Sequence, residues 1–436
     1  MARAKKEAAL TPEERLQAAL VPDWEWPYKL PENWCWTYLT KAAECLDNFR
    51  KPINATERAG RNGNVPYYGA TGQVGWIDDF LTDEDLVLLG EDGAPFLDLI
   101  KDKAYLITGK AWVNNHAHIL RSLFGDTGNR YLLHYLNSFN YAGYVNGTTR
   151  LKLTRASMDT IPIPLPPLAE QQRIVDRIES LFAKLDEAKE KAQAVVDSFE
   201  TRKAAILHKA FTGELTAKWR EEHGISIDNW KTTRFDSVAA IRSNLVDPAE
   251  YQSFPHIAPD NIEKKTGVLL EYHTIAEDGV TSGKHRFYSG QILYSKIRPY
   301  LSKAVVVDFD GLCSADMYPI EAYQNARCLW YYMLSDEFLL QASTAGSRSV
   351  LPKINQKELS ALTVHLPTND REQEEIARIL DELFDKEQQT KEAAEIVLDQ
   401  IDLMKKSILA RAFRGELGTN DPSEESAVEL LKRTIL

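Results

Sequence analysis

Two stretches of the chain carry mostly apolar residues at alternating steps of four and three, which is the spacing of a heptad seam. The first seam consists of Ile174, Ile178, Leu181, Leu185, Ala188, Ala192, Val195, Phe199, Arg202 and Ile206. The second consists of Ile376, Leu380, Leu383, Glu387, Thr390, Ala394, Val397, Ile401, Met404 and Ile408, and its polar members weaken the middle. Each seam predicts one helix of about 40 residues, or roughly 60 Å at 1.5 Å per residue.

The two predicted helices belong to a duplicated block. The sequence "AFTGELT" begins at position 210 and "AFRGELG" at position 412, and the match runs back without a gap to Glu170 and Glu372. Glu170 lies in the first turn, where the helix dipole favours a carboxylate. Gly213 and Gly415 stand where a helix terminator is expected. The block therefore has the same predicted start and end in both copies.

A narrow apolar seam needs a partner to cover it. Each helix could pack separately on its own domain, or the two could pack on each other. Because both seams are narrow and equally long, we favour a mutual coiled coil. An antiparallel pair would give a pseudo-two-fold molecule, which a tandem duplication readily produces.

The segments upstream of the helices are predicted to be β-rich. Short alternating runs such as "AYLITG" at 104 and "AVVVDF" at 304 are typical of strands. Asn33-Trp34 and Asn229-Trp230 open the two segments, which diverge strongly between such landmarks. We predict an α+β fold, with two β-rich mixed domains in pseudo-two-fold arrangement, separated by two long antiparallel coiled-coil helices. The predicted parts are an N-terminal extension (1–30), a first domain (31–165), a first helix with linker (166–220), a second domain (226–367), a second helix (368–417) and an acidic C-terminal tail (418–436).

Composition restricts the class of protein. The chain has 436 residues, a net charge of −12 and no apolar run long enough to span a membrane. Its N-terminus has no apolar core segment and does not resemble a signal peptide. The four cysteines form no CxxC pair, which argues against a zinc ribbon or a disulfide framework and favours a reducing cytoplasm. The acidic total disfavours a nucleic-acid binder but leaves room for local basic faces.

A search for catalytic motifs finds none that holds. The glycine-rich loop and the N/D-P-P-Y/F tetrapeptide of a DNA amino-methyltransferase are both missing. "GVTSGKH" at 279 has three residues between its glycines instead of the four of a phosphate loop, and "PDNIEKK" at 259 places its carboxylates too close for a nuclease. His116 and His118 fall on one face of a predicted strand without a third ligand of clear spacing. We therefore predict no catalytic residue and no metal site.

The duplicated motifs resemble those of a known family. "PLPPLAEQQRIVDRIESLFAKLDEA" with "AFTGEL", repeated as "LPTNDREQEEIARILDELF" with "AFRGEL", closely resembles the specificity subunits of type I restriction-modification systems. The resemblance covers residues 30–417, although "PTNDREQ" departs from the usual "PPLxEQ". It implies a non-catalytic subunit in which each β-rich domain reads one half of a split, asymmetric double-stranded DNA site. It also implies that the helices set the gap and dock two methyltransferase subunits, which restriction and translocase subunits can join. S-adenosylmethionine is expected in the methyltransferase partner and no cofactor in this chain. The predicted coiled-coil or docking residues are Ile174, Ile178, Leu181, Leu185, Phe199, Phe211, Ile376, Leu380, Leu383, Ile401 and Phe413.

The candidate DNA-reading residues lie in loops rich in basic residues, amides and glycine. Arginine suits guanine, asparagine suits adenine, and phosphate contacts fix position. In the first domain the candidates are Arg50, Lys51, Arg58, Arg61, Asn62, Asn64, Arg150 and Lys152. In the second domain they are Lys264, Lys265, Ser282, Lys284, His285, Arg286, Lys296, Arg298, Tyr300, Ser347 and Arg348.

Two other functions remain open at this point. The chain could be part of a fused methyltransferase-specificity protein with activity of its own, which predicts methyl transfer by the isolated chain. It could also be a scaffold that displays two domains for ligands other than DNA, which predicts no sequence-dependent DNA retention with any partner.

Overall fold

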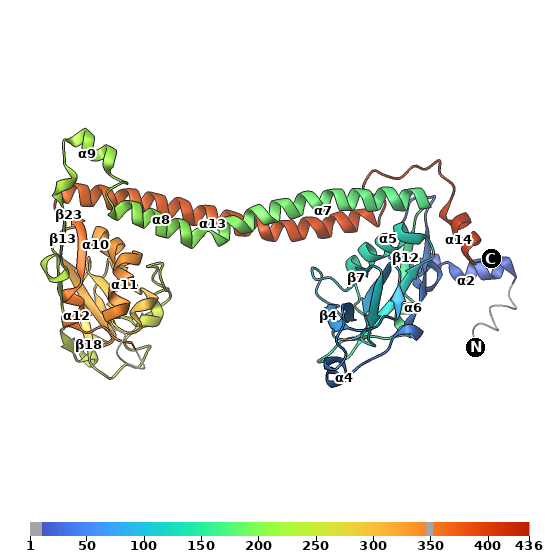
Figure 1. The fold of residues 1–436 in the computed structure, drawn as a ribbon, viewed down its shortest axis with the longest axis horizontal. Helices are drawn as coiled ribbons and strands as arrows, with labels where there is room; N and C mark the ends of the chain where they lie inside the picture. Colours follow the sequence, from blue (N-terminus) through green and yellow to red (C-terminus); the bar gives the residue numbers. More distant parts are fainter. Residues whose placement is uncertain (1–10, 346–351, 436) are drawn as a thin grey trace. The chain divides into compact units, whose positions relative to one another are not determined.

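The computed structural model describes residues 11–345 and 352–435, which divide into two compact units (Figure 1). Unit 1 takes in the chain up to Ala192 and again from Ile396, and unit 2 is the segment Gln193–Glu395. Both long helical stretches therefore pass from one unit into the other.

Unit 1 contains two four-stranded sheets and several shorter helices. One sheet has the order β2-β9-β6-β7 and the other β4-β3-β8-β5, while β1 pairs antiparallel with β12 and β10 with β11. The strands are β1 (Cys35–Tyr38), β2 (Ala43–Cys45), β3 (Val65–Gly69), β4 (Gly72–Ile77), β5 (Thr82–Asp83), β6 (Leu86–Gly90), β7 (Ala104–Ile107), β8 (Lys110–Val113), β9 (Ala117–Ser122), β10 (Val145–Asn146), β11 (Lys152–Leu153) and β12 (Pro162–Leu165). The shorter helices are α2 (Pro12–Ala19), α3 (Leu39–Ala42), α4 (Ala55–Ala59), α5 (Gly125–Ser138), α6 (Arg155–Asp159) and α14 (Ala427–Ile435).

The central strand β6 is apolar on both faces because both faces are covered. Successive side chains of a strand point to opposite sides of the sheet. Val87 and Leu89 join the core that contains Leu136 of α5, whereas Leu86 and Leu88 join a second core between the two sheets. The continuous run "LVLLG" is thus a fully buried strand.

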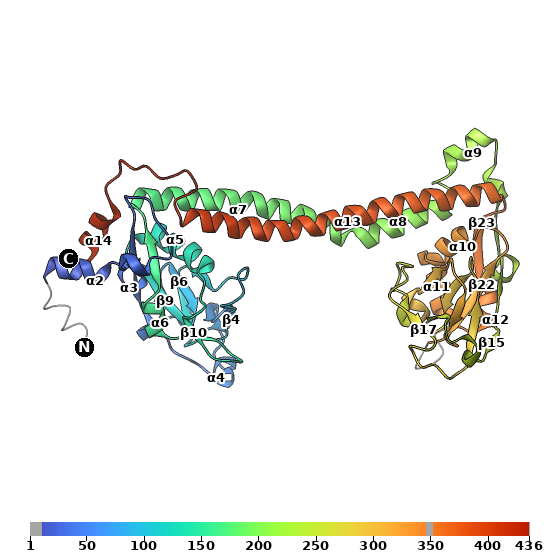
Figure 2. The ribbon, with the colours of Figure 1, turned by 180° about the vertical axis from the view of Figure 1, so that it is seen from behind.

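Unit 2 repeats this plan (Figure 2). Its sheets have the orders β14-β22-β19-β20 and β15-β18-β21-β16-β17, and β13 pairs antiparallel with β23. Ile292 and Tyr294 face the core that contains Leu329 of α10, and Leu293 faces the core between the sheets. The strands are β13 (Trp230–Arg234), β14 (Ala239–Ile241), β15 (Leu245–Val246), β16 (Pro255–Ile257), β17 (His273–Thr274), β18 (Lys284–Phe287), β19 (Ile292–Ser295), β20 (Ala304–Val306), β21 (Gly311–Cys313), β22 (Met317–Ala322) and β23 (Thr363–Pro367). The shorter helices are α9 (Ala217–His223), α10 (Ala326–Met333), α11 (Asp336–Ala345) and α12 (Gln356–Ala361).

The first long helix is interrupted, contrary to the prediction of a single helix. It consists of α7 (Leu168–Asp197) and α8 (Phe199–Phe211), separated at Ser198. The hydroxyl of Ser198 donates to the carbonyl of Ala194 at 2.5 Å and accepts from Arg202. Such local side-chain bonds compete with the regular helix and often bend it. The second long helix, α13 (Asp370–Ala412), is continuous over 43 residues.

The two long helices pair antiparallel, as predicted. In unit 1, Asp186 of α7 meets Lys405 of α13 at 2.5 Å, and Lys189 meets Asp402 at 2.8 Å. The partner number falls as the first number rises, which defines the antiparallel direction.

The same direction holds in unit 2. Nε of Arg202 donates to the Glu387 carboxylate at 2.7 Å, and Nζ of Lys391 lies 5.0 Å from the ring centroid of Phe199. The polar residue Glu387 in the middle of the second seam therefore contributes to the helix pairing, because its carboxylate accepts a hydrogen bond from Arg202 of the first helix. The fold-class prediction of two mixed β-rich domains with antiparallel helices is confirmed.

The predicted seam is wrong in part along α13. Val397 and Met404 are 40% and 49% exposed, whereas Ala394 and Ile401 are buried as predicted. Lys405 replaces Met404 at the contact: its ammonium lies 4.9 Å from the ring centroid of Phe182. A lysine can cover apolar surface with its stem, and the apolar pattern of the sequence does not record this. Ala188, a predicted seam residue of the first helix, is also exposed.

The repeated motif closes the start of the opposite long helix in unit 2. The buried carboxylate of Glu372, in the first turn of α13, accepts the hydroxyl of Thr216 at 2.8 Å, Arg220 at 2.7 Å and the indole N–H of Trp230 at 3.0 Å. Gly213 ends α8 with φ +81°, and a Cβ there would lie 2.7 Å from Ile227. Thr216 and Arg220, which follow α8 in the chain, therefore bind the first turn of α13.

Unit 1 holds the matching arrangement. The buried Glu170 of α7 accepts the hydroxyl of Thr419, the residue after the second "GELG", at 2.6 Å. Arg173 contacts Glu170 at 2.9 Å and binds Glu424 through both guanidinium nitrogens at 2.8 and 2.7 Å. Gly415 ends α13 with φ +72°. Each copy of the motif thus finishes one long helix and anchors the start of the other.

The segment predicted as an acidic tail contains a packed helix. Ala427 and Leu431 of α14 are fully buried in a small core with Ala19 of α2 and Leu165 of β12. The N-terminal and C-terminal segments of unit 1 therefore stabilise each other. Among the described residues, no helix is long and apolar enough to cross a membrane.

Candidate DNA interface

In unit 1 the first candidate loop rests on an aromatic surface. The guanidinium of Arg61 lies 4.7 Å from the ring centroid of Trp112, and Nζ of Lys51 lies 5.7 Å from the same ring. Arg58 lies 4.7 Å from the ring centroid of Tyr67. Cation–π contacts of this kind hold a basic side chain in place while its edge stays available to an acceptor.

The same loop leaves two amides free. Arg61 is also paired with Asp78 at 2.6 Å, and its hydrogen bond lowers the pKa of that carboxyl. Asn62 and Asn64 are exposed, and within residues 11–345 and 352–435 their side chains have no hydrogen-bond partner. A fixed arginine beside free amides has the donor and acceptor groups for contacts with base edges.

Arg50 is engaged inside the fold. Its guanidinium pairs with Asp47 at 3.1 Å and with Glu91, donates to the carbonyl of Ala117 at 3.1 Å, and its side chain is 16% exposed. Lys152 also pairs with Glu91, at 3.0 Å, but its side chain is 51% exposed. Arg150 is 60% exposed and pairs with Asp92 at 2.8 Å. Lys152 and Arg150 remain accessible to DNA, whereas Arg50 mainly stabilises the domain.

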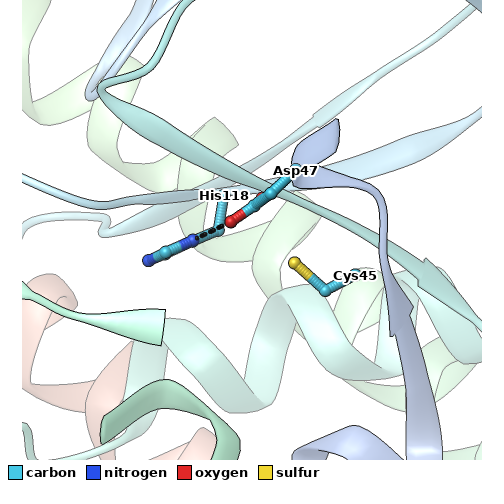
Figure 3. A group of neighbouring side chains, drawn as sticks. All are labelled: Cys45, Asp47 and His118. Carbon is cyan, nitrogen blue, oxygen red and sulfur yellow. Dashed lines mark hydrogen bonds and ion pairs between the residues drawn. The ribbon is translucent and has the colours of Figure 1, made fainter. Parts of the chain in front are cut away.

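A group of potential metal ligands in unit 1 includes Asp47, the ion-pair partner of Arg50 (Figure 3). Cys45, Asp47 and His118 come close enough for one ion. However, Nδ1 of His118 lies 2.7 Å from the Asp47 carboxylate, and Nε2 lies 3.0 Å from the carbonyl oxygen of Leu153. Both ring nitrogens therefore face oxygen acceptors, which suits two N–H donors and leaves no lone pair for a metal.

The electrostatics of the group agree with an ion pair. Burial is the largest single influence and opposes ionisation of Asp47, but the hydrogen bond and charge of His118, together with hydrogen bonds from Ile119 and Cys45, outweigh it and lower the pKa of Asp47 to about 2. Burial raises the pKa of the Cys45 thiol to about 12, so the thiolate needed for metal binding is disfavoured. His116 lies apart from this group and pairs with Asp92 at 2.7 Å. We interpret the group as a structural Asp47–His118 pair.

In unit 2 one candidate group lies on strand β18 and just before it. Lys284 and His285 are 6% and 3% exposed, and the Lys284 ammonium donates to the carbonyl of Ser282 at 3.0 Å and to its hydroxyl at 2.6 Å. Burial lowers the pKa of Lys284, and burial together with the charge of Lys296 lowers that of His285. Arg286 is half-buried among three aromatic rings, those of Tyr251, Phe254 and Tyr288. This group presents few free donors.

A second group in unit 2 surrounds a strained turn. Arg298 and Ser302 have φ +48° and +46°, a conformation that non-glycine residues seldom adopt, and they flank the 3₁₀ turn Pro299–Leu301. Strained backbone of this kind costs about 1–3 kcal/mol per residue and clusters at functional sites. The exposed Arg298 guanidinium has no ion pair or hydrogen bond with any residue that the structure describes. Tyr300 at the tip of the turn is 48% exposed.

Neighbouring lysines join this turn. The backbone N–H of Lys265 donates to the carbonyl of Leu301 at 3.1 Å, which places the exposed Lys264 and Lys265 beside it. Lys296 lies 4.0 Å from Asp316 and is half-buried. Ser347 and Arg348 lie outside the described residues. The best-exposed candidate group in unit 2 therefore consists of the basic residues Lys264, Lys265 and Arg298 with the aromatic Tyr300.

The predicted helix residues mostly form the interior. Ile174, Ile178, Phe199, Ile376, Leu380 and Ile401 are buried, and Leu181, Leu185 and Leu383 are half-buried. Phe211 packs edge-on against Tyr332 at 5.0 Å, and Phe413 packs against Tyr135 at 5.1 Å. These residues hold the helices together and to the domains.

The sequence analysis missed several residues of the candidate site and of the two contacts that close the long helices. It overlooked Trp112 and Tyr67, which support the basic loop of unit 1, because they lie on strands far from that loop in the sequence. It also overlooked Thr216 and Thr419. The threonine after each "GEL" was a visible signal, although the second copy has one inserted glycine.

The fold defines a protein with two related β-rich heads on paired antiparallel helices, in which basic and aromatic loops differ between the heads. Residues 45–196 and 227–397 match the family described as "Type I restriction modification DNA specificity domain". The chain therefore belongs to the family of type I restriction-modification DNA specificity subunits.

Individual relatives agree with this assignment. The chain is 35% identical over 380 residues to the type I restriction enzyme EcoDI specificity subunit of Escherichia coli, covering 82% of this chain and 84% of that protein. It is 25% identical over 320 residues to the EcoKI specificity subunit of Escherichia coli K12, covering 66% and 65%. The fold is similar to that of the HsdS subunit from Thermoanaerobacter tengcongensis, with a TM-score of 0.56, 18% identity and coverage of 90% and 100%. A chain from a structural study of complex assembly and conformational transition of the type I R-M system gives a TM-score of 0.64, with the same identity and coverage.

The family fixes the coarse function. The chain is a DNA specificity subunit, a recognition component and not a catalytic one, of a restriction-modification complex that acts on DNA.

Proposed function

We propose that units 1 and 2 each read one half of a split, asymmetric double-stranded DNA site, and that the long helices set the unread gap. The observation that carries this proposal is the contrast between duplicated and divergent parts. Glu170 with Thr419 and Glu372 with Thr216 form the same closure twice, whereas the exposed loops of the two units share no such pattern. Equal frames with unequal loops suit two readers of different sequences.

The loops also answer the objection raised by the net charge of −12. In unit 1, Arg61 and Lys51 lie over Trp112, and the exposed Asn62 and Asn64 follow Arg61 in the same loop. In unit 2, exposed basic groups gather around the strained turn at Arg298. Local cations can bind phosphate and base edges even when the remaining surface is acidic.

The helices also dock two methyltransferase subunits in this proposal. An apolar stripe on α13, away from the coiled-coil contact, is exposed and available to one of the two partners: Ile396 is 56%, Val397 40%, Leu403 59% and Met404 49% exposed. Apolar stripes of this kind mark interaction sites more often than ordinary surface. The methyltransferase partners would carry S-adenosylmethionine, restriction and translocase subunits would join them, and the complex would act in the bacterial or archaeal cytoplasm.

Co-expression with a methyltransferase subunit of its own system tests the proposal. Host DNA is then sequenced with methylation-sensitive reads. We expect one new methylated motif with two unequal specified halves around an unspecified gap. A stable complex that adds no methylated motif would contradict DNA reading by the two units and leave only the docking helices in place.

A further inference from the structure

Unit 1 contains a cavity of about 790 Å³ beside its long helices. It lies between the C-terminal half of α5, the segment 99–106, and the facing sides of α7 and α13. Aromatic rings form much of its wall, namely those of Tyr28, Tyr135, Phe139 and Phe182. This volume falls within the range of roughly 300–1,000 Å³ that is usual for small-molecule sites.

The cavity wall carries more cations than anions. Of its lysines, Lys189 and Lys405 are paired with carboxylates, at 2.8 and 2.5 Å. Lys103 is only 2% exposed; among the described residues its ammonium has one hydrogen bond, to the carbonyl of Asn137 at 3.5 Å, and the charges of Asp98 and Asp102 act on it without an ion pair. Lys406 is exposed and forms no ion pair with a described residue. A nearly buried ammonium with one long hydrogen bond is costly unless an acceptor reaches it.

Unit 2 differs from unit 1 at the position equivalent to this cavity. Lys203 and Phe384 of unit 2 correspond to Lys405 and Phe182 of unit 1 in the duplicated block, and their contact is the same, with Nζ 5.4 Å from the ring centroid. There, however, the ammonium of Lys203 donates to the carbonyls of Lys265 and Thr266, both at 3.1 Å. The chain's own turn supplies oxygen acceptors to the lysine.

The same turn occupies the space that is open in unit 1. Gly267 fits so closely against Trp330 of α10 that a Cβ would lie 2.3 Å from the indole ring. Trp330 corresponds to Leu133 of α5, because Arg327–Asp381 and Arg130–Glu179 form equivalent ion pairs three residues earlier on the two helices. Leu133 lines the cavity of unit 1. At the equivalent place unit 1 therefore has a smaller residue, and the described residues leave the cavity open there.

We propose that this cavity binds a small organic anion with an aromatic or aliphatic body. Lys405 is already paired with Asp186, so the acidic oxygens of the ligand would meet the ammonium groups of Lys103 and Lys406. Its body would lie against Leu133 and Phe182. Because the equivalent place in unit 2 is filled, the site occurs once in the chain. A pair of equivalent partner subunits would need it twice, which favours a small ligand over those partners.

Anilinonaphthalene sulfonate, an aromatic anion, is the probe. The full chain is titrated and followed by fluorescence and by calorimetry. We expect saturable binding with one site per chain. Leu133→Trp, which copies the residue of unit 2, should abolish it. Lys406→Gln should weaken it about tenfold, the effect of losing one charge-assisted contact.

The control is Lys191→Gln, which alters an α7 lysine that is 74% exposed, pairs with Glu187 and lies outside the cavity. It should bind the probe like the parent chain. Circular dichroism establishes that each variant is folded, and if Leu133→Trp is not, the exposed Lys406→Gln decides. Non-saturable binding, or equal affinity in the parent chain and Lys406→Gln, would overturn the proposal.

Discussion

The two units differ most where they face solvent and least where they meet the long helices. Phe413 packs on Tyr135 in unit 1 as Phe211 packs on Tyr332 in unit 2. The candidate loops are unlike: one rests on Trp112, and the other is built on a left-handed Arg298. Duplication has kept the packing that positions the domains, whereas the loops that could contact DNA have changed freely.

The largest effect is expected from removing Glu372. Glu372→Ala leaves Arg220, Thr216 and Trp230 without their shared acceptor. Loss of one partner of a buried ion pair costs about 3–5 kcal/mol. Urea unfolding followed by tryptophan fluorescence measures the free energy of unfolding, and Glu374→Ala, an exposed residue nearby on α13, is the control.

Unit 1 should tolerate the equivalent change better. In Glu170→Ala, Arg173 keeps both hydrogen bonds to Glu424. Equal losses of unfolding free energy for Glu170→Ala and Glu372→Ala would show that the Arg173–Glu424 pair does not compensate for the missing carboxylate.

A matched pair on α13 tests the corrected seam. Ile401 is 2% exposed and Met404 49% exposed. Ile401→Ala should lower the free energy of unfolding by about 2–4 kcal/mol, and Met404→Ala by less than about 0.5 kcal/mol. Differential scanning calorimetry measures both. A comparable loss for Met404→Ala would restore the seam expected from the sequence.

The Asp47–His118 pair of unit 1 gives a pH-dependent prediction. The pKa of Asp47 is lowered from 3.8 to about 2, so its contribution is fully present above its ordinary pKa and is lost as pH falls from about 4 to about 2. Asp47→Asn should lower the free energy of unfolding by about 2 kcal/mol at neutral pH, and the difference from the parent chain should shrink below pH of about 4. Denaturant unfolding across this range measures it. Asp83→Asn at an exposed position is the control, and a difference that does not change with pH would contradict the pairing.

The smallest effect is expected at two glycines after α13, where alanine variants distinguish backbone strain from a steric clash. Gly415 and Gly418 have φ +72° and +73°, but a Cβ at Gly415 would lie 2.4 Å from Pro31, and one at Gly418 meets nothing within 4 Å. Both alanine variants should lose about 1 kcal/mol from backbone strain, and Gly415→Ala should lose more. Thermal unfolding compares them, and equal losses would exclude the close approach to Pro31 as a cause.

The sequence predicted the helical frame well because its signals are local and duplicated. Heptad spacing and the terminal glycines placed both long helices, and the tandem duplication suggested their antiparallel pairing. It failed where a polar group does the packing: Lys405 takes the place expected for Met404, and Ser198 interrupts the first helix. The helix α14 was overlooked because the acidic character of the tail obscured the apolar pair Ala427 and Leu431.

The candidate site was less predictable because its contacts join distant positions. Arg50 looks like a free cation in the sequence, yet its carboxylate partner Glu91 lies 41 residues away. The support of Arg61 by Trp112 is equally invisible along the chain. Residue types identified the loops, but only the fold separates accessible groups from groups that are already paired.

The central claim is that each unit reads one half of the DNA site. The direct test is methylation sequencing after co-expression with the methyltransferase subunit, using one loop variant for each unit. Asn62→Ala with Asn64→Ala changes unit 1, and Arg298→Ala with Tyr300→Ala changes unit 2. We predict that each double variant relaxes one half of the methylated motif and leaves the other half and the gap unchanged. Equal degradation of both halves by either variant would contradict the account.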